Sequence, residues 1–244
     1  MCRYKFQIMN KLNTPAEEAY KILRTNMQFN KPYKKIKSVA IVSWNPGEGK
    51  TTTAINLGIV ISKLGFKVLL VDADLRKPMM IKHLGGTNIK GLSNYLMGNA
   101  QFSDVVSVTN IPDFCFAASG IVPSNPLELL NSQKFDDFLR KAYVQFDIVI
   151  IDTPPLGSVI DSAVIASKSD GALIVIKPGR MTGKSAQMAR DQLGNLDSKI
   201  LGAVFNNMKE SDYRSYYSDY DYYGTGRKYS LGWLNSLKKR KILK

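Results

Sequence analysis

One glycine-containing segment constrains the fold of this chain more than any other feature. An apolar run precedes it, and a longer apolar stretch follows it as far as Leu64. The segment reads Ser43-Trp44-Asn45-Pro46-Gly47-Glu48-Gly49-Lys50-Thr51. A strand, a glycine turn and the start of a helix follow one another here, an order that is typical of a phosphate-binding loop in an α/β protein.

The chemistry of this segment predicts a nucleotide site. Its glycines allow main-chain N–H groups to curl around phosphate oxygens, and the helix N-terminus adds positive potential. Lys50 is expected to reach the β and γ phosphates, and the Thr51 hydroxyl to ligate Mg²⁺. The residues predicted to contact ATP along the loop are Pro46, Gly47, Glu48, Gly49, Lys50, Thr51 and Thr52. One element of the usual pattern is missing, because Trp44 stands where such loops begin with glycine.

The order of apolar segments predicts a doubly wound, mostly parallel α/β sheet, because strand-like runs alternate with helical segments after the loop. These runs are Lys67 to Val71, Phe114 to Ala117, Phe146 to Ile151, Gly171 to Ile176 and Ile200 to Phe205. Residues 1–36 are predicted to form an N-terminal helix with its lead-in, and residues 37–208 the nucleotide-binding domain. Polar residues dominate 209–244, which predicts a flexible tail.

Charge and cysteine content narrow the class of protein. Among 244 residues, lysine and arginine exceed the acidic residues by 14, which suits an anionic partner such as a nucleotide, a nucleic acid, an acidic protein surface or the inner membrane leaflet, and charge alone does not choose among these. Cys2 and Cys115 are too few for a disulfide framework, so we expect a cytoplasmic protein. No apolar run approaches the ~20 residues of a membrane-spanning helix, and we therefore expect any membrane contact to be peripheral.

Two acidic motifs follow predicted strands, at the sheet edge where doubly wound proteins bind ligands. Asp72 and Asp74 come after one strand, and Asp152 comes after another. A carboxylate at the end of a buried strand is costly unless a cation meets it, and Mg²⁺ on ATP is such a cation. The structural alternative is that Asp152 merely caps its strand, or that Asp72 and Asp74 pair with Arg76 and Lys77.

These motifs resemble those of the bacterial tyrosine kinases of capsular and exopolysaccharide synthesis, and the likeness extends over nearly the whole chain. The loop from Pro46 to Thr51 looks like the P-loop of that family, whose first glycine is commonly absent. Val71 to Pro78 is similar to its second aspartate motif, and Ile151 to Pro155 to its Walker B motif. Pro123 to Leu130 looks like a further family signature, and Glu18 to Asn26 resembles its ring-forming helix.

The resemblance implies a stand-alone P-loop kinase, with a fold shared by partition and cell-division ATPases, that uses ATP and Mg²⁺. Lys50 and the cation would neutralise the transferring phosphoryl group, while Asp72 would hold and partly deprotonate the acceptor hydroxyl. Asp74 and Asp152 would organise Mg²⁺ with Thr51, although sequence alone does not separate the roles of Asp72 and Asp74. Asn206 is assigned to the adenine by analogy only, because an asparagine that ends a strand is structural about as often.

The resemblance also implies partners. Glu18, Lys21 and Arg24 would mediate assembly into a ring, in which Lys21 keeps the charge of the more common arginine but loses its bidentate geometry. A transmembrane adaptor would activate the kinase at the inner face of the cell membrane, and a cognate tyrosine phosphatase would reverse its action. No nucleic acid is expected as a partner.

The C-terminal tail carries a cluster of tyrosines, which the resemblance identifies as phosphate acceptors. They are Tyr213, Tyr216, Tyr217, Tyr220, Tyr222, Tyr223 and Tyr229. On composition alone a low-complexity linker is the favoured interpretation of this cluster, and the nucleotide site upstream reverses that preference. Beyond it, the basic and apolar segment from Leu231 to Lys244 is compatible both with peripheral contact to an anionic membrane and with a solvated tail.

Two other functions remain open on sequence grounds. A partition or cell-division positioning ATPase shares the fold and the acidic motifs and acts on DNA or membrane. Its loop normally carries a further lysine where this chain has Asn45, and it needs no tyrosine-rich tail. A scaffold that binds nucleotide without catalysis is the second rival, and the intact set of Lys50, Thr51 and the three aspartates weighs against it.

Overall fold

An eight-stranded sheet forms the centre of the computed structural model, which describes residues 5–8, 12, 14–29, 36–84 and 90–208. The strands are β1 (Lys5–Phe6), β2 (Ser38–Val42), β3 (Val68–Asp72), β4 (Val106–Thr109), β5 (Phe114–Ala117), β6 (Ile148–Asp152), β7 (Ala172–Ile176) and β8 (Ile200–Phe205). Their order is β1-β4-β5-β3-β6-β2-β7-β8, and every pair is parallel except β4–β5. By its contacts the chain divides into two units, Met1–Asn207 and Met208–Lys244, and all of these strands belong to the first.

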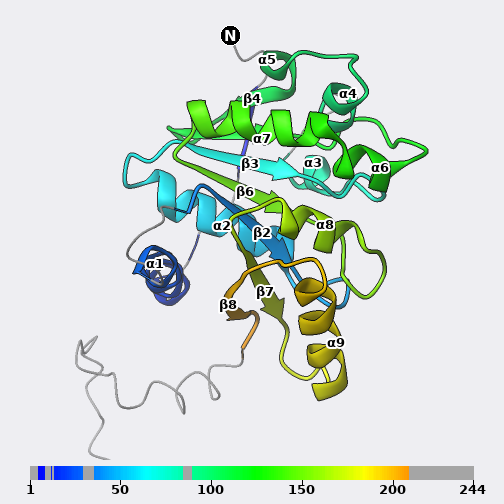
Figure 1. The fold of residues 1–244 in the computed structure, drawn as a ribbon. Coiled ribbons are helices and arrows are strands. Elements are labelled where there is room, and N and C mark those ends of the chain that lie inside the picture. Colours follow the sequence, from blue (N-terminus) through cyan, green and yellow to red (C-terminus); the bar gives the residue numbers. More distant parts are fainter. Residues whose placement is uncertain (1–4, 9–11, 13, 30–35, 85–89, 209–244) are drawn as a thin grey trace, which may run out of the picture. The chain divides into compact units, whose positions relative to one another are not determined.

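Helices lie on both faces of this sheet (Figure 1). They are α1 (Thr14–Phe29), α2 (Lys50–Ser62), α3 (Met80–His83), α4 (Leu92–Leu96), α5 (Phe102–Val105), α6 (Pro126–Asn131), α7 (Gln133–Gln145), α8 (Asp161–Ser167) and α9 (Gly183–Gly194). Figure 1 shows α1 beside α2, and α7 running across β3 and β6. Within the described part of the chain, no helix has the length and apolarity needed to span a lipid bilayer.

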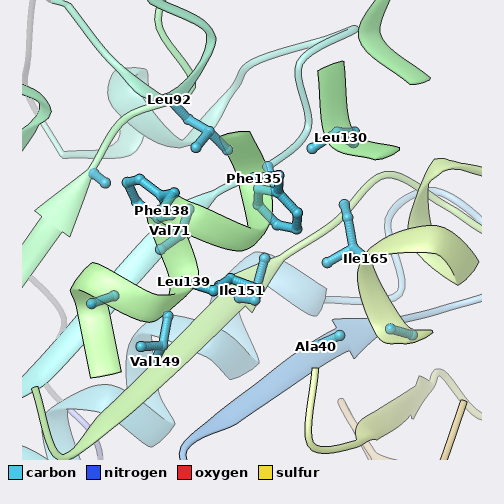
Figure 2. Close-up of a cluster of buried hydrophobic side chains, with 14 of the residues drawn as sticks. Ala40, Val71, Leu92, Leu130, Phe135, Phe138, Leu139, Val149, Ile151 and Ile165 are labelled. Atoms are coloured by element: carbon cyan, nitrogen blue, oxygen red, sulfur yellow. The ribbon is translucent and has the colours of Figure 1, made fainter. Parts of the chain in front are cut away.

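Two hydrophobic clusters, one on each face, hold the layers together. Side chains alternate along a strand, so Val39 and Ile41 of β2 join the cluster under α2, while Ala40 and Val42 join the other. Figure 2 shows this second cluster, in which Phe135 and its neighbours on α7 pack on β3 and β6. Burial on both faces explains why the central strands consist of continuous apolar runs.

The predicted fold class is confirmed, and all five strands predicted after the loop are present within two residues of their expected bounds. Helix α2 ends at Ser62, just before Gly65, whose φ of 82° is in the left-handed region that favours glycine. The sequence analysis missed β1 and β4. Strand β1 has only two residues, and β4 follows α5 directly, without the glycine or proline that marks most strand boundaries.

Candidate active site

The phosphate-binding loop lies between β2 and α2, at the carboxyl end of the sheet. Gly47 and Gly49 have φ angles of 75° and 97°, a left-handed backbone that is strained for residues with a side chain. A Cβ atom on Gly49 would lie 1.8 Å from Nδ2 of Asn206, so the loop also needs glycine there for space. Asn206 follows β8 and donates a hydrogen bond from Nδ2 to the carbonyl of Glu48 at 2.9 Å. The side chain of Asn206 therefore braces the loop, and its contact with adenine stays a prediction.

Lys50 begins α2 and points its ammonium group into the base of the loop. Its Nζ donates a hydrogen bond to Oγ of Ser43 at 3.0 Å, and the side chain is buried. Burial lowers the pKa of Lys50, and the negative charges of Asp152, Asp74 and Glu48 oppose that shift. The lysine is thus held beside the loop, and the neighbouring acids favour its charged form, the form that binds phosphate.

Asp152 and Thr51 meet across the sheet edge. The Thr51 hydroxyl donates a hydrogen bond to Oδ2 of Asp152 at 2.6 Å. The other carboxylate oxygen, Oδ1, is buried and has no hydrogen-bond partner among the described residues. Burial raises the pKa of Asp152 to about 6, although the Thr51 hydroxyl and the Lys50 charge both act to lower it. The carboxylate is therefore costly in the free protein and is satisfied only in part.

Asp72 lies directly beside Asp152, because the two residues are register partners in the parallel strands β3 and β6. Its Oδ1 accepts a hydrogen bond from the backbone N–H of Asp74 at 3.2 Å, and its Oδ2 is buried with no hydrogen-bond partner in the part of the chain that the structure describes. Burial, and then the charge of Asp152, raise the pKa of Asp72 well above its usual range. Two neighbouring carboxylates thus each leave one buried oxygen unpaired.

Asp74 is less buried and ends the same motif. Its Oδ1 accepts a hydrogen bond from the backbone N–H of Lys77 at 2.9 Å, which closes a short turn. Burial raises the pKa of Asp74, and the hydrogen bonds from the N–H groups of Lys77 and Arg76 act against that rise. This carboxylate is satisfied by its own loop, in contrast to Asp72 and Asp152.

Among the described residues, the Arg76 guanidinium pairs with Asp161 and not with the aspartates of its own motif, the pairing that was the structural alternative for them. Its Nε and Nη2 bind Oδ2 and Oδ1 of Asp161 at 2.7 and 3.0 Å. Asp161 is buried at the start of α8, so this bidentate pair ties the loop after β3 to the segment after β6. The sequence analysis missed Asp161, because neither spacing nor composition links it to Arg76.

The segment after β6 is fastened to the phosphate-binding loop by its backbone. The N–H groups of Leu156 and Gly157 donate hydrogen bonds to the carbonyls of Ser43 and Trp44 at 2.8 and 3.0 Å. A Cβ atom on Gly157 would lie 2.8 Å from the carbonyl oxygen of Trp44, so this close approach requires glycine. Trp44 occupies the position of the missing glycine, and its carbonyl accepts the hydrogen bond from Gly157.

The residues present fit a divalent cation that is shared with a nucleotide. No group of three or more His, Cys, Asp or Glu side chains that would hold a metal is found in residues 5–8, 12, 14–29, 36–84 and 90–208. A cation on ATP does not need such a group, since Mg²⁺ keeps water and phosphate ligands and takes one or two carboxylates. The unpaired Oδ1 of Asp152, whose Oδ2 accepts from the Thr51 hydroxyl, matches that requirement.

The structure brings most of the predicted site residues together. Pro46 and Thr52 are exposed on the loop and at the start of α2, and Glu48 is buried with its carboxylate accepting a hydrogen bond from the N–H of Asn45. The seven predicted acceptor tyrosines and the basic C-terminal segment lie outside the described residues.

The residues predicted to mediate assembly lie on α1, apart from the phosphate-binding loop. Lys21 and Glu18 are exposed and form an ion pair at 2.6 Å. Nε of Arg24 is buried and has no hydrogen-bond partner within the described residues. A pocket of about 410 Å³ lies between α1, β7 and β8, lined by Leu23, Asn26, Met27, Leu173, Leu201, Gly202 and Ala203. It is separate from the phosphate-binding loop, so the predicted chemistry does not use it.

Comparison with known proteins shows which family this chain belongs to. Residues 36–196 match the family described as AAA domain. Tyrosine-protein kinase CpsD of Streptococcus agalactiae is 42% identical over 210 residues, which cover 86% of this chain and 90% of that protein. Tyrosine-protein kinase YwqD of Bacillus subtilis (strain 168) is 39% identical over 208 residues, with coverage of 85% and 86%. The chain belongs to the bacterial tyrosine kinases.

Solved structures agree with this assignment. The kinase domain of Escherichia coli tyrosine kinase ETK superposes on this kinase with a TM-score of 0.74 and 32% identity, covering 80% of this chain and 78% of that chain. The cell-division ATPase MinD of Pyrococcus furiosus reaches a TM-score of 0.62 with 27% identity over 72% of this chain and 74% of that chain. The bacterial tyrosine kinases therefore share their fold with the positioning ATPases, as the sequence analysis expected.

Proposed function

We propose that this kinase transfers the γ-phosphoryl group of ATP to its own C-terminal tyrosines and thereby regulates synthesis and export of a capsular or extracellular polysaccharide. The acceptors are Tyr213, Tyr216, Tyr217, Tyr220, Tyr222, Tyr223 and Tyr229. The observation that carries the proposal is that the neighbouring residues Asp72 and Asp152 each keep one buried carboxylate oxygen unpaired within the described residues, and that Asp152 is hydrogen-bonded to Thr51. Buried, unpaired charge is retained at a site that a cation completes. The role in polysaccharide export rests on the family resemblance.

Each residue of the site has a distinct proposed task. Lys50 and the N–H groups of the loop bind the phosphates, and Lys50 neutralises the charge that develops as the bond from γ-phosphorus to the bridging oxygen breaks. Thr51, Asp74 and Asp152 hold Mg²⁺, which when bound shields phosphate charge. Asp72 orients the tyrosine hydroxyl and accepts its proton as the new oxygen–phosphorus bond forms. The raised pKa of Asp72 makes it a stronger base than an ordinary carboxylate.

The proposed transfer takes place between subunits of a ring. Glu18, Lys21 and Arg24 on α1 contact the neighbouring subunit, and a transmembrane adaptor recruits the cytoplasmic kinase to the inner face of the membrane. One similar solved structure is that of the chimerical protein CapA2B2, with a TM-score of 0.78 and 28% identity over 86% of this chain and 96% of that chain. Its two-part name supports a kinase that acts together with a second component. A cognate phosphatase removes the phosphates.

Phosphorylation of the tail supplies a means of regulation. Residues 209–244 carry nine basic and four acidic side chains, a net charge of +5. Each phosphate adds about −1.5 to −2, so modification of all the clustered tyrosines adds roughly −10 to −14 and reverses the sign of the tail. We expect unmodified tails to bind neighbouring acidic sites and hold the ring together, and modified tails to leave them.

Labelled ATP tests the proposal. Purified protein is incubated with labelled ATP, Mg²⁺ and an activating adaptor fragment, and the label is mapped along the chain. Label on the seven tyrosines supports the kinase, release of free phosphate alone supports a positioning ATPase, and neither supports a scaffold. Lys50→Met should abolish labelling, while Lys67→Met, an exposed lysine at the opposite end of β3, should leave it unchanged.

The assembly is tested separately by size. Analytical ultracentrifugation of the full chain before and after incubation with ATP and Mg²⁺ should show loss of the oligomer in parallel with tyrosine phosphorylation. A variant in which all seven tyrosines are replaced by phenylalanine should stay assembled. An oligomer whose mass does not change with phosphorylation would contradict the proposed switch.

A further inference from the structure

The loop between β7 and α9 lies against the phosphate-binding loop and carries an arginine onto its glycine turn. Nδ2 of Asn45 donates a hydrogen bond to the carbonyl of Arg180 at 3.3 Å. Nη1 of Arg180 lies 3.5 Å from the carbonyl oxygen of Pro46. A Cβ atom on Gly47 would be 3.6 Å from the same Nη1. The guanidinium group therefore rests beside the turn whose N–H groups are predicted to surround phosphate.

Both ends of this loop fix the position of Arg180. Strand β7 pairs with β2, so the two loops start from adjacent strands at the same edge of the sheet. The N–H of Arg180 donates a hydrogen bond to the carbonyl of Lys177 at 3.1 Å, and Gly179 supplies the positive φ of 78° within this turn. Two residues later, Oγ1 of Thr182 caps α9 by accepting a hydrogen bond from the N–H of Ser185 at 3.1 Å. Arg180 is thus held on a short, defined turn.

Within the described chain, the guanidinium group of Arg180 forms no ion pair. The five ion pairs found in residues 5–8, 12, 14–29, 36–84 and 90–208 do not include it. Its nearest acid in the loop, Glu48, turns its carboxylate to the N–H of Asn45 instead. A guanidinium has five N–H donors, and one long contact to the Pro46 carbonyl leaves most of them available. This side chain is exposed, so its free donors are available to an anionic ligand.

We propose that Arg180 is a phosphate ligand of the nucleotide that binds in this loop, a second positive charge supplied by the same chain beside Lys50. The inference rests on the proposed function, because it presupposes a nucleotide at this site. Arginine suits the task, since its planar group forms paired, charge-assisted hydrogen bonds with phosphate oxygens. Asn45 is the positioning residue, because its amide fastens the backbone of Arg180 to the loop.

Nucleotide binding to the full chain tests this assignment without a catalytic readout. Dissociation constants for ATP, ADP and AMP are measured by calorimetry for wild type, Arg180→Gln, Arg180→Lys and a matched control, Lys184→Gln. Lys184 is an exposed base on the first turn of α9, so its replacement removes the same charge from the same segment. We expect Arg180→Gln to weaken ATP and ADP binding roughly 10-fold, the usual effect of one lost charge-assisted contact.

The variants separate a phosphate contact from a structural role. AMP binding should change little, because the loop's glycine turn cradles the phosphates that AMP lacks, and Arg180→Lys should recover part of the lost affinity. The control should bind all three nucleotides like wild type. Equal ATP affinities for Arg180→Gln and Lys184→Gln would overturn the inference, as would a parallel loss of AMP binding or a lowered unfolding temperature. If wild type itself binds no ATP, the proposed function fails as well.

Discussion

Buried polar groups are hydrogen-bonded at the amino ends of the central strands, whereas some are left unpaired at the carboxyl ends. At the amino end of β2, Oδ2 of Asp170 accepts hydrogen bonds from the N–H groups of Lys37 and Ser38 at 2.7 and 3.0 Å. The Ser38 hydroxyl lies 2.7 Å from the Tyr143 hydroxyl. At the carboxyl end, Asp72 and Asp152 each keep one oxygen without a partner. None of the unpaired buried side-chain atoms of the described residues belongs to the amino-end cluster.

The difference separates stability from function within one sheet. Every bond of the amino-end cluster joins elements that fold together, so it contributes to the free energy of unfolding. The carboxyl end holds two carboxylates side by side and burdens the fold with their desolvation. Such an arrangement is stable in the free protein only because the surrounding strands are well packed. The same residue type therefore acts as a structural acceptor at one end and as a candidate cation ligand at the other.

Asp152→Asn tests the carboxyl end and should have the largest effect. Loss of a cation ligand is expected to remove about 4 kcal/mol of transition-state stabilisation, or roughly 10³-fold in the rate of tyrosine labelling. The free energy of unfolding without nucleotide should not fall, because the buried charge disappears and an amide oxygen still accepts from Thr51. Urea denaturation and labelled ATP measure the two effects. A large fall in the free energy of unfolding would mean that Asp152 stabilises the fold instead of binding a cation.

Asp170→Ala tests the amino end and should give the reverse result. Removal of the acceptor leaves two backbone N–H groups unpaired, so we expect the free energy of unfolding to fall by about 3 kcal/mol. The ATP affinity of the variant, measured under conditions in which it is fully folded, should match that of wild type. The measurement is urea denaturation followed by circular dichroism, with calorimetric ATP titration below the transition. A selective loss of ATP binding would contradict the division between the two ends.

The pH dependence of stability should also distinguish them. Because the pKa of Asp152 in the folded protein is about 6 and its ordinary value is 3.8, the folded state binds the proton more tightly than the unfolded state. Stability contributed by the protonated form is therefore lost as pH rises from about 4 to above 6, by on the order of 2 kcal/mol. For metal-free protein in EDTA, the free energy of unfolding should depend less steeply on pH in Asp152→Asn than in wild type. Equal slopes for the two proteins would contradict the raised pKa of Asp152.

Tyr143→Phe provides the smallest test. The variant removes one hydroxyl that bonds to Ser38, and the remaining ring keeps its packing on the core. We expect a loss of about 1 kcal/mol in the free energy of unfolding and no change in tyrosine labelling. Thermal denaturation and labelled ATP measure both. An effect on labelling would mean that the amino end takes part in function.

Much of the site was accessible from sequence because its residues occupy local motifs. Lys50 and Thr51 follow a glycine turn, and Asp72 and Asp152 each end an apolar strand, so their shared sheet edge follows from the fold class. The hydrogen bond from Asn206 to the Glu48 carbonyl joins residues 158 positions apart, and no sequence motif predicts it. Arg76, similarly, stands next to two aspartates in sequence and yet binds Asp161.

The sequence by itself determined the fold class, six of the eight strands of the described chain, the loop predicted to receive phosphate and the chemical type of each candidate ligand. These follow from apolar periodicity and from short motifs, which act over a few residues. Only the tertiary structure decided which carboxylates stay unpaired, where the Arg180 guanidinium lies and which loop Asn45 fastens. Those outcomes depend on strand register and on packing between distant segments, and a register shift of one residue would reverse the direction of every side chain in a strand.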